Sequence, residues 1–139
     1  MEIREEILRQ IPPYQLGGVW KDVRPGIEKL LRKCPDTFTP EDVYWRLRND
    51  QAGLFLVGDG FMVLETSTDT FNGQKTLWVW LLYWKSAEKN RTWLEGQLDL
   101  IAKKSGCRFV SFRSPRLGWK KQAIGYKLKL ITWEREIVL

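Results

Sequence analysis

The 139-residue chain predicts a single domain, residues 1–139, of the α+β or α/β class. Residues 77–84 form an unbroken apolar run, which is typical of a strand covered on both faces. A charged helical segment over about 87–105 leads into a further apolar run at 109–112, and this order predicts a βαβ unit with parallel strands. We therefore expect a mixed sheet in which an antiparallel N-terminal meander precedes the βαβ unit, with helices on both faces.

The N-terminal part is expected to contain helices and a short edge strand. Residues 1–10 have the pattern of a short amphipathic helix that stops at Pro12-Pro13. Residues 14–20 are interpreted as an edge strand broken by Gly17-Gly18, and a helix is expected to begin near Pro25 and to end at Pro35. A further helix to about residue 48 should begin after Thr39, a good N-cap.

The remaining elements follow from apolar runs and turn residues. The runs 54–57 and 61–64 flank a Gly-Asp-Gly link, which predicts a β-hairpin, and a polar stretch over 66–75 joins it to the central strand. The long helix over 87–105 ends with two lysines before Gly106, as a helix C-terminus prefers. A short helix over about 117–124 and a last strand over 127–137 complete the expected fold.

Composition excludes several classes of function. The chain has no histidine, which removes the commonest general base and metal ligand, and Cys34 and Cys107 lie too far apart to suggest a thiolate metal site. No apolar run approaches the ~20 residues of a membrane span, and the first six residues are too charged for a secretory signal. We expect an intracellular protein with two free thiols and no metal.

Charge is distributed unevenly along the chain. Residues 84–129 hold twelve Lys or Arg against three acids, whereas residues 1–83 hold ten basic residues against twelve acids. A basic half indicates an acidic partner such as a nucleotide-like cofactor, nucleic acid or an acidic protein face. Solvated helix and strand faces account for the same pattern equally well.

The order of elements resembles the GNAT superfamily of acyl-CoA-dependent N-acetyltransferases. The resemblance covers roughly residues 19–137 as architecture. Residues 121–127, Lys-Gln-Ala-Ile-Gly-Tyr-Lys, look like the family's stretch in which a helix ends at glycine and an aromatic residue opens the last strand. Residues 104–107, Lys-Ser-Gly-Cys, look like its helix-to-strand link. Both similarities indicate fold much more than activity, because each is mostly a helix C-cap.

The segment that corresponds to the family's pyrophosphate loop departs from the family pattern. In the family this loop is rich in glycine, so that backbone N–H groups close around phosphate at a helix N-terminus. Here residues 84–93 contain no glycine, and Glu88 and Trp93 would repel or crowd a phosphate. If the protein is active, the resemblance implies that acetyl-CoA is the cofactor. Residues of the central strand and of the following segment would then contact it: Leu81, Leu82, Tyr83, Lys89, Asn90, Arg91 and Thr92.

Two residues are candidates for acid–base catalysis, again only if the protein is active. Lys121 stands where many family members carry a tyrosine general acid, and a lysine would need a lowered pKa to protonate a thiolate. Glu65, at the end of the hairpin, is the best carboxylate for a general base. A carboxylate at a strand end is more often simply solvated.

The sequence leaves three functions open. The first is a GNAT-like protein that has lost catalysis, binds no cofactor and acts as a structural or interaction component. Degenerate GNAT-like proteins of this size resemble small proteins of tailed bacteriophages, some of which are virion or ejected components, so we expect it in the bacterial cytoplasm or in a virion. Its contacts with the assembly would use exposed aromatic and basic residues, Tyr14, Trp84, Arg113, Arg116, Trp119 and Lys120. The second is an active N-acetyltransferase with an atypical pyrophosphate loop. The third is nucleic-acid binding through Arg113, Arg116, Lys120 and Lys121, with Trp119 stacking on a base. We adopt the first as the working hypothesis.

Overall fold

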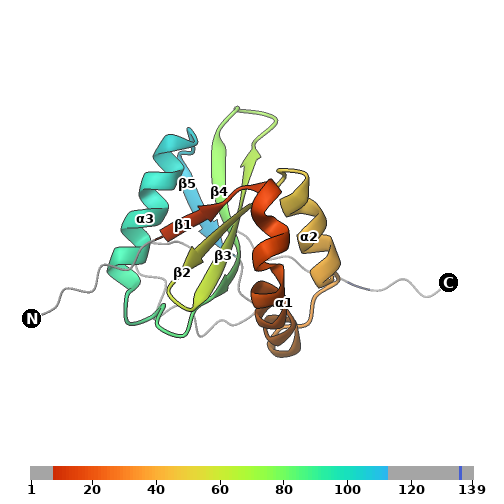
Figure 1. Ribbon diagram of the computed structural model, residues 1–139. Helices are drawn as coiled ribbons and strands as arrows, with labels where there is room; N and C mark the ends of the chain where they lie inside the picture. Colours follow the sequence, from red (N-terminus) through yellow and green to blue (C-terminus); the bar gives the residue numbers. More distant parts are fainter. Residues whose placement is uncertain (1–7, 113–134, 136–139) are drawn as a thin grey trace, which may run out of the picture.

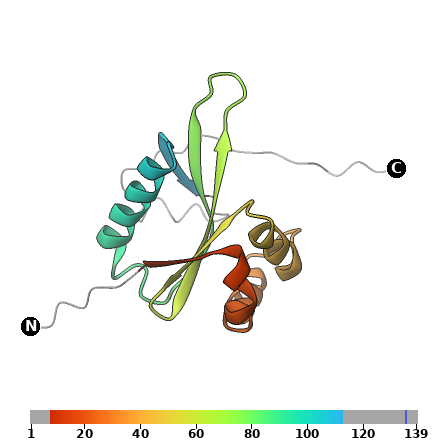
Figure 2. The same ribbon diagram turned by 45° about the horizontal axis from the view of Figure 1, so that its top comes forward.

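The computed structural model describes residues 8–112 and residue 135. They form a five-stranded sheet with the strand order β1-β2-β3-β4-β5, and helices lie on both of its faces (Figure 1). Helices α1 and α2 cover one face, and helix α3 covers the other (Figures 1 and 2). The predicted mixed sheet with helices on both faces is therefore confirmed. The short helix and the last strand predicted over 117–124 and 127–137 lie outside the described residues.

The N-terminal segment differs from the prediction. Strand β1, Leu8–Ile11, pairs antiparallel with β2, so the end of the predicted first helix is an edge strand instead. A short 3-10 turn, η1 (Pro13–Gln15), leads directly into α1, Leu16–Lys33. Helix α1 thus contains the glycine pair of the expected strand, and it contains Pro25 in its interior instead of at its start. The predicted strand over 14–20 is wrong.

Burial explains why α1 is one continuous helix. Leu16, Val23 and Ile27 are almost fully buried and recur at helical spacing, so the apolar stripe that drives packing extends across the proline. Pro25 is exposed on the opposite face, where water can hydrogen-bond the backbone carbonyl that it leaves without a donor. Packing therefore outweighs the low helix propensity of glycine and proline here.

Helix α2, Pro40–Arg48, begins as predicted. The Thr39 hydroxyl accepts a hydrogen bond from the Asp42 amide at 3.3 Å, and the Asp42 carboxylate accepts one from the Thr39 amide at 2.8 Å. This reciprocal arrangement is a capping box, which fixes the start of the helix. Buried Val43 and Leu47 then face the sheet.

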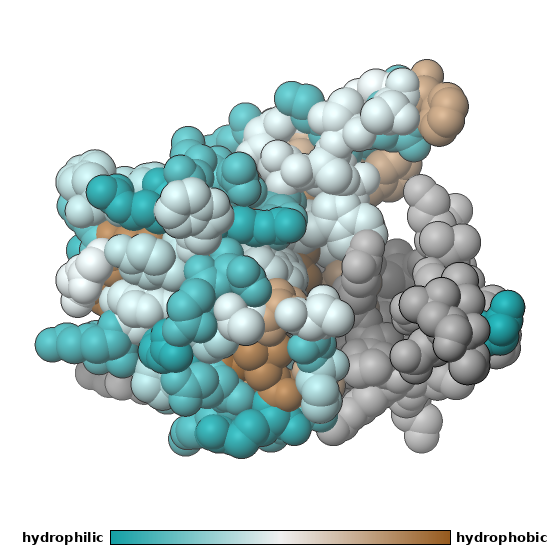
Figure 3. All heavy atoms as spheres, turned by 90° about the vertical axis from the view of Figure 1, so that its right-hand side faces the viewer, coloured by the Kyte–Doolittle hydropathy of each residue, from teal (hydrophilic) through white to brown (hydrophobic). Residues whose placement is uncertain are grey.

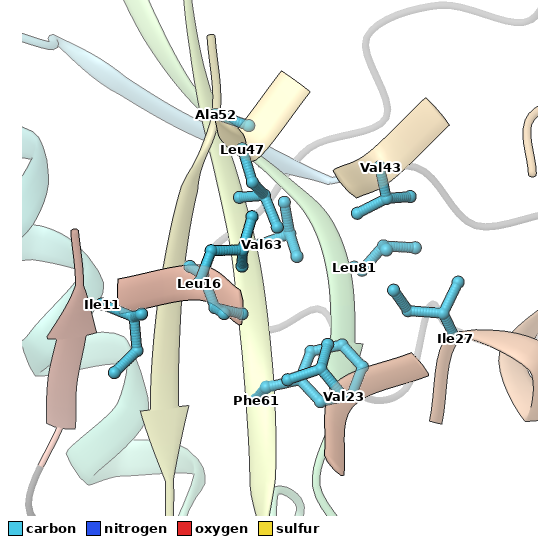
Figure 4. Packing of buried hydrophobic residues seen from close by; sticks show 11 residues of the cluster. Ile11, Leu16, Val23, Ile27, Val43, Leu47, Ala52, Phe61, Val63 and Leu81 are labelled. Carbon is cyan, nitrogen blue, oxygen red and sulfur yellow. The ribbon is translucent and has the colours of Figure 1, made fainter. Parts of the chain in front are cut away.

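The central hairpins are also as predicted. Strand β2, Gly53–Val57, and strand β3, Gly60–Thr68, pair antiparallel across a two-residue turn, and β3 pairs antiparallel with β4, Lys75–Tyr83. Side chains alternate between the two faces. One apolar cluster lies under α1 and α2 (Figure 4): Ile11, Leu16, Val23, Ile27, Val43, Leu47, Ala52, Leu54, Phe61, Val63 and Leu81. The other lies under α3: Phe55, Met62, Leu64, Leu77, Leu94, Leu98 and Ala102.

Strand β4 contains a β-bulge. Val63 is paired with Leu81 and Leu64 with Val79, so Trp80 is an extra residue on β4. Trp80 and Leu81 consequently both pack on the side of α1 and α2, although they are neighbours in the chain. The bulge changes which residues face each layer over the last third of the strand.

The βαβ unit is confirmed by the pairing of its strands. Helix α3, Arg91–Lys104, follows β4, and strand β5, Phe109–Phe112, then pairs parallel with β4. The helix begins four residues later than expected, and Gly106 adopts a positive φ of 71° just after its end. Within the described part of the chain, no helix combines the length and the apolar character that crossing a membrane requires.

Candidate functional site

The described pairing of β4 with β5 ends at Val79 and Phe112, and Phe112 is the last described residue of this segment. The register runs from Thr76 and Phe109 to Val79 and Phe112. Among the described residues, β4 therefore continues over residues 80–83 without a strand partner on this edge. Unpaired N–H and C=O groups on a strand edge are able to bind an extended ligand. We call this end of β4, with the loop 84–90 and the first turn of α3, the candidate site.

Three predicted cofactor residues lie on β4 beyond its described pairing with β5. Leu81 is buried under α1 and α2, and Leu82 packs towards α3. Tyr83 lies on the α1 side, where its ring is 5.6 Å from the ring of Phe61, centroid to centroid. The strand thus sends apolar side chains into both layers, which leaves its backbone edge as the part that can contact a ligand.

The loop 84–90 is a series of turns closed by its own hydrogen bonds. The Ala87 amide donates to the Trp84 carbonyl at 3.1 Å, and the Asn90 amide donates to the Ser86 carbonyl at 3.0 Å. The Asn90 side-chain amide donates to the same Ser86 carbonyl at 2.9 Å. Two of the loop amides are therefore engaged within the loop itself, and the Asn90 side chain does not cap α3.

Trp84 is buried, contrary to the prediction that it is an exposed interaction residue. Only 7% of its surface is accessible, and its ring packs edge-on against Trp93 at a centroid distance of 6.0 Å. The apolar run of β4 thus extends by one residue into the core, because Trp84 fills the space between the strand end and the first turn of α3. This tryptophan anchors the loop from inside.

The first turn of α3 holds the remaining predicted cofactor residues. Asn90 is the N-cap, Arg91 is the first helical residue, and Lys89 and Thr92 are exposed. The first intrahelical hydrogen bond runs from the Leu94 amide to the Asn90 carbonyl, so the amides of residues 91–93 have no acceptor among the described residues. These amides lie at the positive end of the helix dipole.

Glu65, the predicted general base, is held in an ion pair. Its Oε1 accepts a hydrogen bond from Arg46 of α2 at 2.8 Å. The Arg46 guanidinium lies 5.2 Å from the centroid of the Trp80 ring, so the arginine joins the carboxylate to the bulge of β4. This arrangement ties α2 to the sheet and engages the carboxylate in a structural contact.

A cavity rich in positive charge lies beside the end of β4, and the sequence analysis did not predict it. It has a volume of about 320 Å³ and is lined by Lys29, Leu30, Arg32, Lys33, Tyr83 and Lys85. The Lys29 Nζ atom is 6.0 Å from the centroid of the Tyr83 ring. Only the tertiary structure joins Lys85 to the end of α1, because they are separated by more than fifty residues in the sequence.

Exposed aromatic side chains lie elsewhere on the surface. Tyr14 is 78% exposed, as the interaction hypothesis predicts, and Trp45 and Phe71, which were not predicted, are 65% and 98% exposed. Trp45 lines a groove of about 480 Å³ between the start of α1 and α2, together with Gly17, Trp20, Glu41 and Tyr44. Figure 3 shows the face of the molecule that carries α1 and α2. This face is mainly hydrophilic, with one small apolar area and an apolar group at the end of the β3–β4 hairpin.

Ionisable groups near these features are perturbed in two places. A hydrogen bond from the Arg24 guanidinium at the edge of the aromatic groove lowers the pKa of Glu41, and the same contact raises the pKa of Arg24. Burial raises the pKa of the Cys107 thiol.

Over residues 8–112 and residue 135 there is no cluster of three or more potential metal ligands. Five predicted site residues lie outside the described part of the chain: Arg113, Arg116, Trp119, Lys120 and Lys121.

Comparison with known proteins gives a result for structure only. No family model matches the sequence, and no curated protein matches it. Among solved structures, an aminoglycoside acetyltransferase from an uncultured soil metagenomic sample is 8% identical with a TM-score of 0.68, covering 99% of this chain and 100% of the other. The BH1408 protein of Bacillus halodurans, as a tetramutant, is 11% identical with a TM-score of 0.66, covering 94% and 99%. A "probable acetyltransferase" is 13% identical with a TM-score of 0.65, covering 96% and 97%. The chain therefore has the fold of GNAT-type acetyltransferases.

Proposed function

We propose that this GNAT-fold protein has lost acetyl-CoA-dependent catalysis and serves as a structural or protein-interaction component, with a bacteriophage virion as the assembly to be tested. The observation that carries the proposal is the loop between β4 and α3. The amides of Ala87 and Asn90 are bound within the loop, and Trp84 fills its inner side. A fold that keeps its scaffold and loses its site commonly becomes a binding module.

The chemistry of diphosphate binding explains why this loop matters. A phosphate cradle needs several backbone N–H groups that point at one centre, and glycine permits the close approach and the turns that achieve this. No residue from 84 to 93 is a glycine. Lys89 and Arg91 supply charge at this loop, but flexible side chains do not replace an organised set of amides.

The interaction half of the proposal is supported by Phe71. Its ring is 98% exposed at the tip of the β3–β4 hairpin. The Asp69 carboxylate accepts hydrogen bonds from the Phe71 amide at 2.8 Å and from the Asn72 amide at 3.2 Å, while the Gly73 amide donates to the Asp69 carbonyl at 2.9 Å. The hairpin tip thus presents an aromatic ring on an ordered backbone, which lowers the entropy cost of docking it into a partner.

Site-specific photo-crosslinking tests the interaction. A benzophenone amino acid is placed at position 71 or 45, and at position 100 as a control, since Leu100 is a comparable apolar side chain that is 50% exposed on α3. Irradiation in the native host or in assembled virions should join positions 71 and 45 to the same structural protein. The proposal fails if neither position forms an adduct, or if position 100 gives the same adducts.

One observation favours an acyl-CoA-dependent N-acetyltransferase as the second candidate. Among the described residues, β4 has no strand partner on this edge over residues 80–83 and the amides of residues 91–93 have no acceptor, and both features lie at the same end of the sheet. Thermal unfolding with millimolar acetyl-CoA separates the two candidates, because a ligand at a hundredfold its Kd stabilises by about 2.7 kcal/mol. We expect no acetyl-CoA-dependent shift. A shift that is lost in Arg91→Ala would show acetyl-CoA binding at the start of α3 and would favour the second candidate over the first.

A further inference from the structure

The cavity between the end of α1 and the end of β4 has no assigned ligand, and we propose that it binds the phosphate group of a small molecule. This inference goes beyond the proposed interaction function, which uses other surfaces. Within the described part of the chain, the cavity is lined by four cationic side chains, those of Lys29, Arg32, Lys33 and Lys85, and by no acidic residue. A phosphate offers several oxygens to such donors at once.

The cations converge because of helix geometry and the course of β4. Lys29, Arg32 and Lys33 are separated by three and four positions on α1, so they lie on one side of the helix. Lys85 is the second residue after β4 and approaches the cavity from the sheet. None of the four side chains forms an ion pair with a described residue, since the ion pairs there involve Arg24 and Arg46.

The helix dipole accounts for only part of this cluster. Arg32 and Lys33 lie in the last turn of α1, where cations interact favourably with the C-terminal carbonyls. Lys29 lies a turn earlier, and Lys85 belongs to a different element. Like charges brought together repel, so the cluster costs stability unless an anion balances it.

The floor of the cavity is suited to a small ligand. Leu30 and the ring of Tyr83 supply apolar surface, and the tyrosine ring supports Lys29 through a cation–π contact. The Tyr83 hydroxyl has no hydrogen-bond partner among the described residues, so it is free to donate to a phosphate oxygen. A volume of about 320 Å³ is at the lower end of the range for small-molecule sites.

Calorimetry with sodium pyrophosphate, on the full chain, tests the proposal. Sodium phosphate and a sugar phosphate form two further arms, and sodium chloride at equal ionic strength is the blank. We expect saturable binding with one site per chain. Lys29→Met and Lys85→Met should each weaken pyrophosphate binding at least tenfold, because a charge-assisted hydrogen bond contributes about 1.5–3 kcal/mol. Tighter binding of the sugar phosphate than of phosphate would identify an organic phosphate as the ligand, and equal binding would identify the free anion.

Matched controls make the result decisive. Lys104→Met removes an equally exposed lysine at the end of α3 and should leave binding unchanged. Neither cavity variant should unfold at lower temperature without ligand, because each relieves repulsion. Equal binding by Lys29→Met, Lys85→Met and the parent chain would overturn the proposal, as would a signal that chloride reproduces. Stronger competition by an oligonucleotide, with a steep salt dependence, would also overturn it in favour of nucleic acid.

The same variants separate this site from the acetyl-CoA question. If acetyl-CoA binds and Arg91→Ala abolishes binding while Lys29→Met does not, the proposed loss of cofactor binding fails and the phosphate cavity is judged on the pyrophosphate result alone. If pyrophosphate binds and acetyl-CoA does not, both proposals stand.

Discussion

Replacing Gly60 with alanine should displace the start of the candidate site. Gly60 is the first residue of β3, and it lies under the end of β4. A Cβ atom at this position would lie 2.0 Å from the Tyr83 carbonyl oxygen and 2.7 Å from the Trp84 Cα atom. Both obstacles are backbone atoms, so no rotation of a side chain relieves the clash.

The magnitude follows from these distances. Ordinary Cβ contacts begin near 3.4 Å, so the Tyr83 carbonyl has to withdraw by about 1.4 Å from its present 2.0 Å. Overpacking in a core costs typically 1–3 kcal/mol, and a clash with rigid backbone belongs at the upper end of that range. We therefore expect Gly60→Ala to lower the free energy of unfolding by about 3 kcal/mol, which corresponds to a fall in Tm of about 10 °C for a domain of this size.

Urea unfolding followed by circular dichroism measures this effect, and Gly96→Ala is its control. Gly96 lies inside α3 with no atom within 4 Å of its ideal Cβ position, so alanine should stabilise the protein there by about 1 kcal/mol. If Gly60→Ala unfolds within 0.5 kcal/mol of the parent chain, the close approach of β3 to the end of β4 is not the constraint that we infer. Destabilisation in both variants would point instead to a general intolerance of added methyl groups.

Three further predictions concern the cap, the thiols and the acidic limb of stability. Thr39→Ala removes the capping hydroxyl of α2 and should cost about 1 kcal/mol in urea unfolding; a loss below 0.3 kcal/mol would contradict the role of the capping box. Iodoacetamide at pH 8 should label exposed Cys34 before Cys107, because burial raises the pKa of the Cys107 thiol, and mass spectrometry would show this order reversed if that burial were wrong. The pKa of Glu41 is lowered by Arg24, so its stabilising contribution is present above the ordinary value of about 4.3 and disappears as the pH falls through the lowered value. Glu41→Gln should therefore flatten the acid-side loss of Tm; an unchanged pH profile would show that this ion pair does not contribute.

The sequence predicts the centre of the fold well because apolar runs leave few alternatives there. The Gly-Asp-Gly link can only close a tight hairpin, and the run that becomes β4 has to lie inside a sheet. The Thr39 cap is equally local, since its two hydrogen bonds join residues three positions apart. Elements whose structure depends on residues close to them in the sequence are therefore predicted correctly.

The N-terminal segment is mispredicted because distant contacts decide it. Gly17-Gly18 and Pro25 disfavour a helix locally, but the buried stripe of Leu16 and Ile27 against the sheet holds α1 together. Likewise, Leu8–Ile11 becomes a strand because β2 offers an edge to pair with. A short sequence window around α1 does not show the sheet that the helix packs on, and one around β1 does not show β2.

The candidate site is predicted only as a region. The sequence identifies the segment from Leu81 to Thr92, but not that Trp84 turns inward or that Arg46 engages Glu65. The cationic cavity is missed because it joins α1 to a residue beyond β4. Charge counts along the chain cannot show which helix and strand ends the tertiary structure brings together.

The extra residue at Trp80 places two neighbouring side chains of β4 on one face of the sheet. Val79 and Leu81 pair with consecutive residues of β3, so deleting Trp80 would close a regular ladder and leave Leu82 on the α3 side and Tyr83 on the α1 side. The deletion would remove the ring that packs against Phe38 and lies beside the Arg46 guanidinium. The bulge thus adds a tie between the sheet and the two N-terminal helices without changing which layer the end of the strand faces.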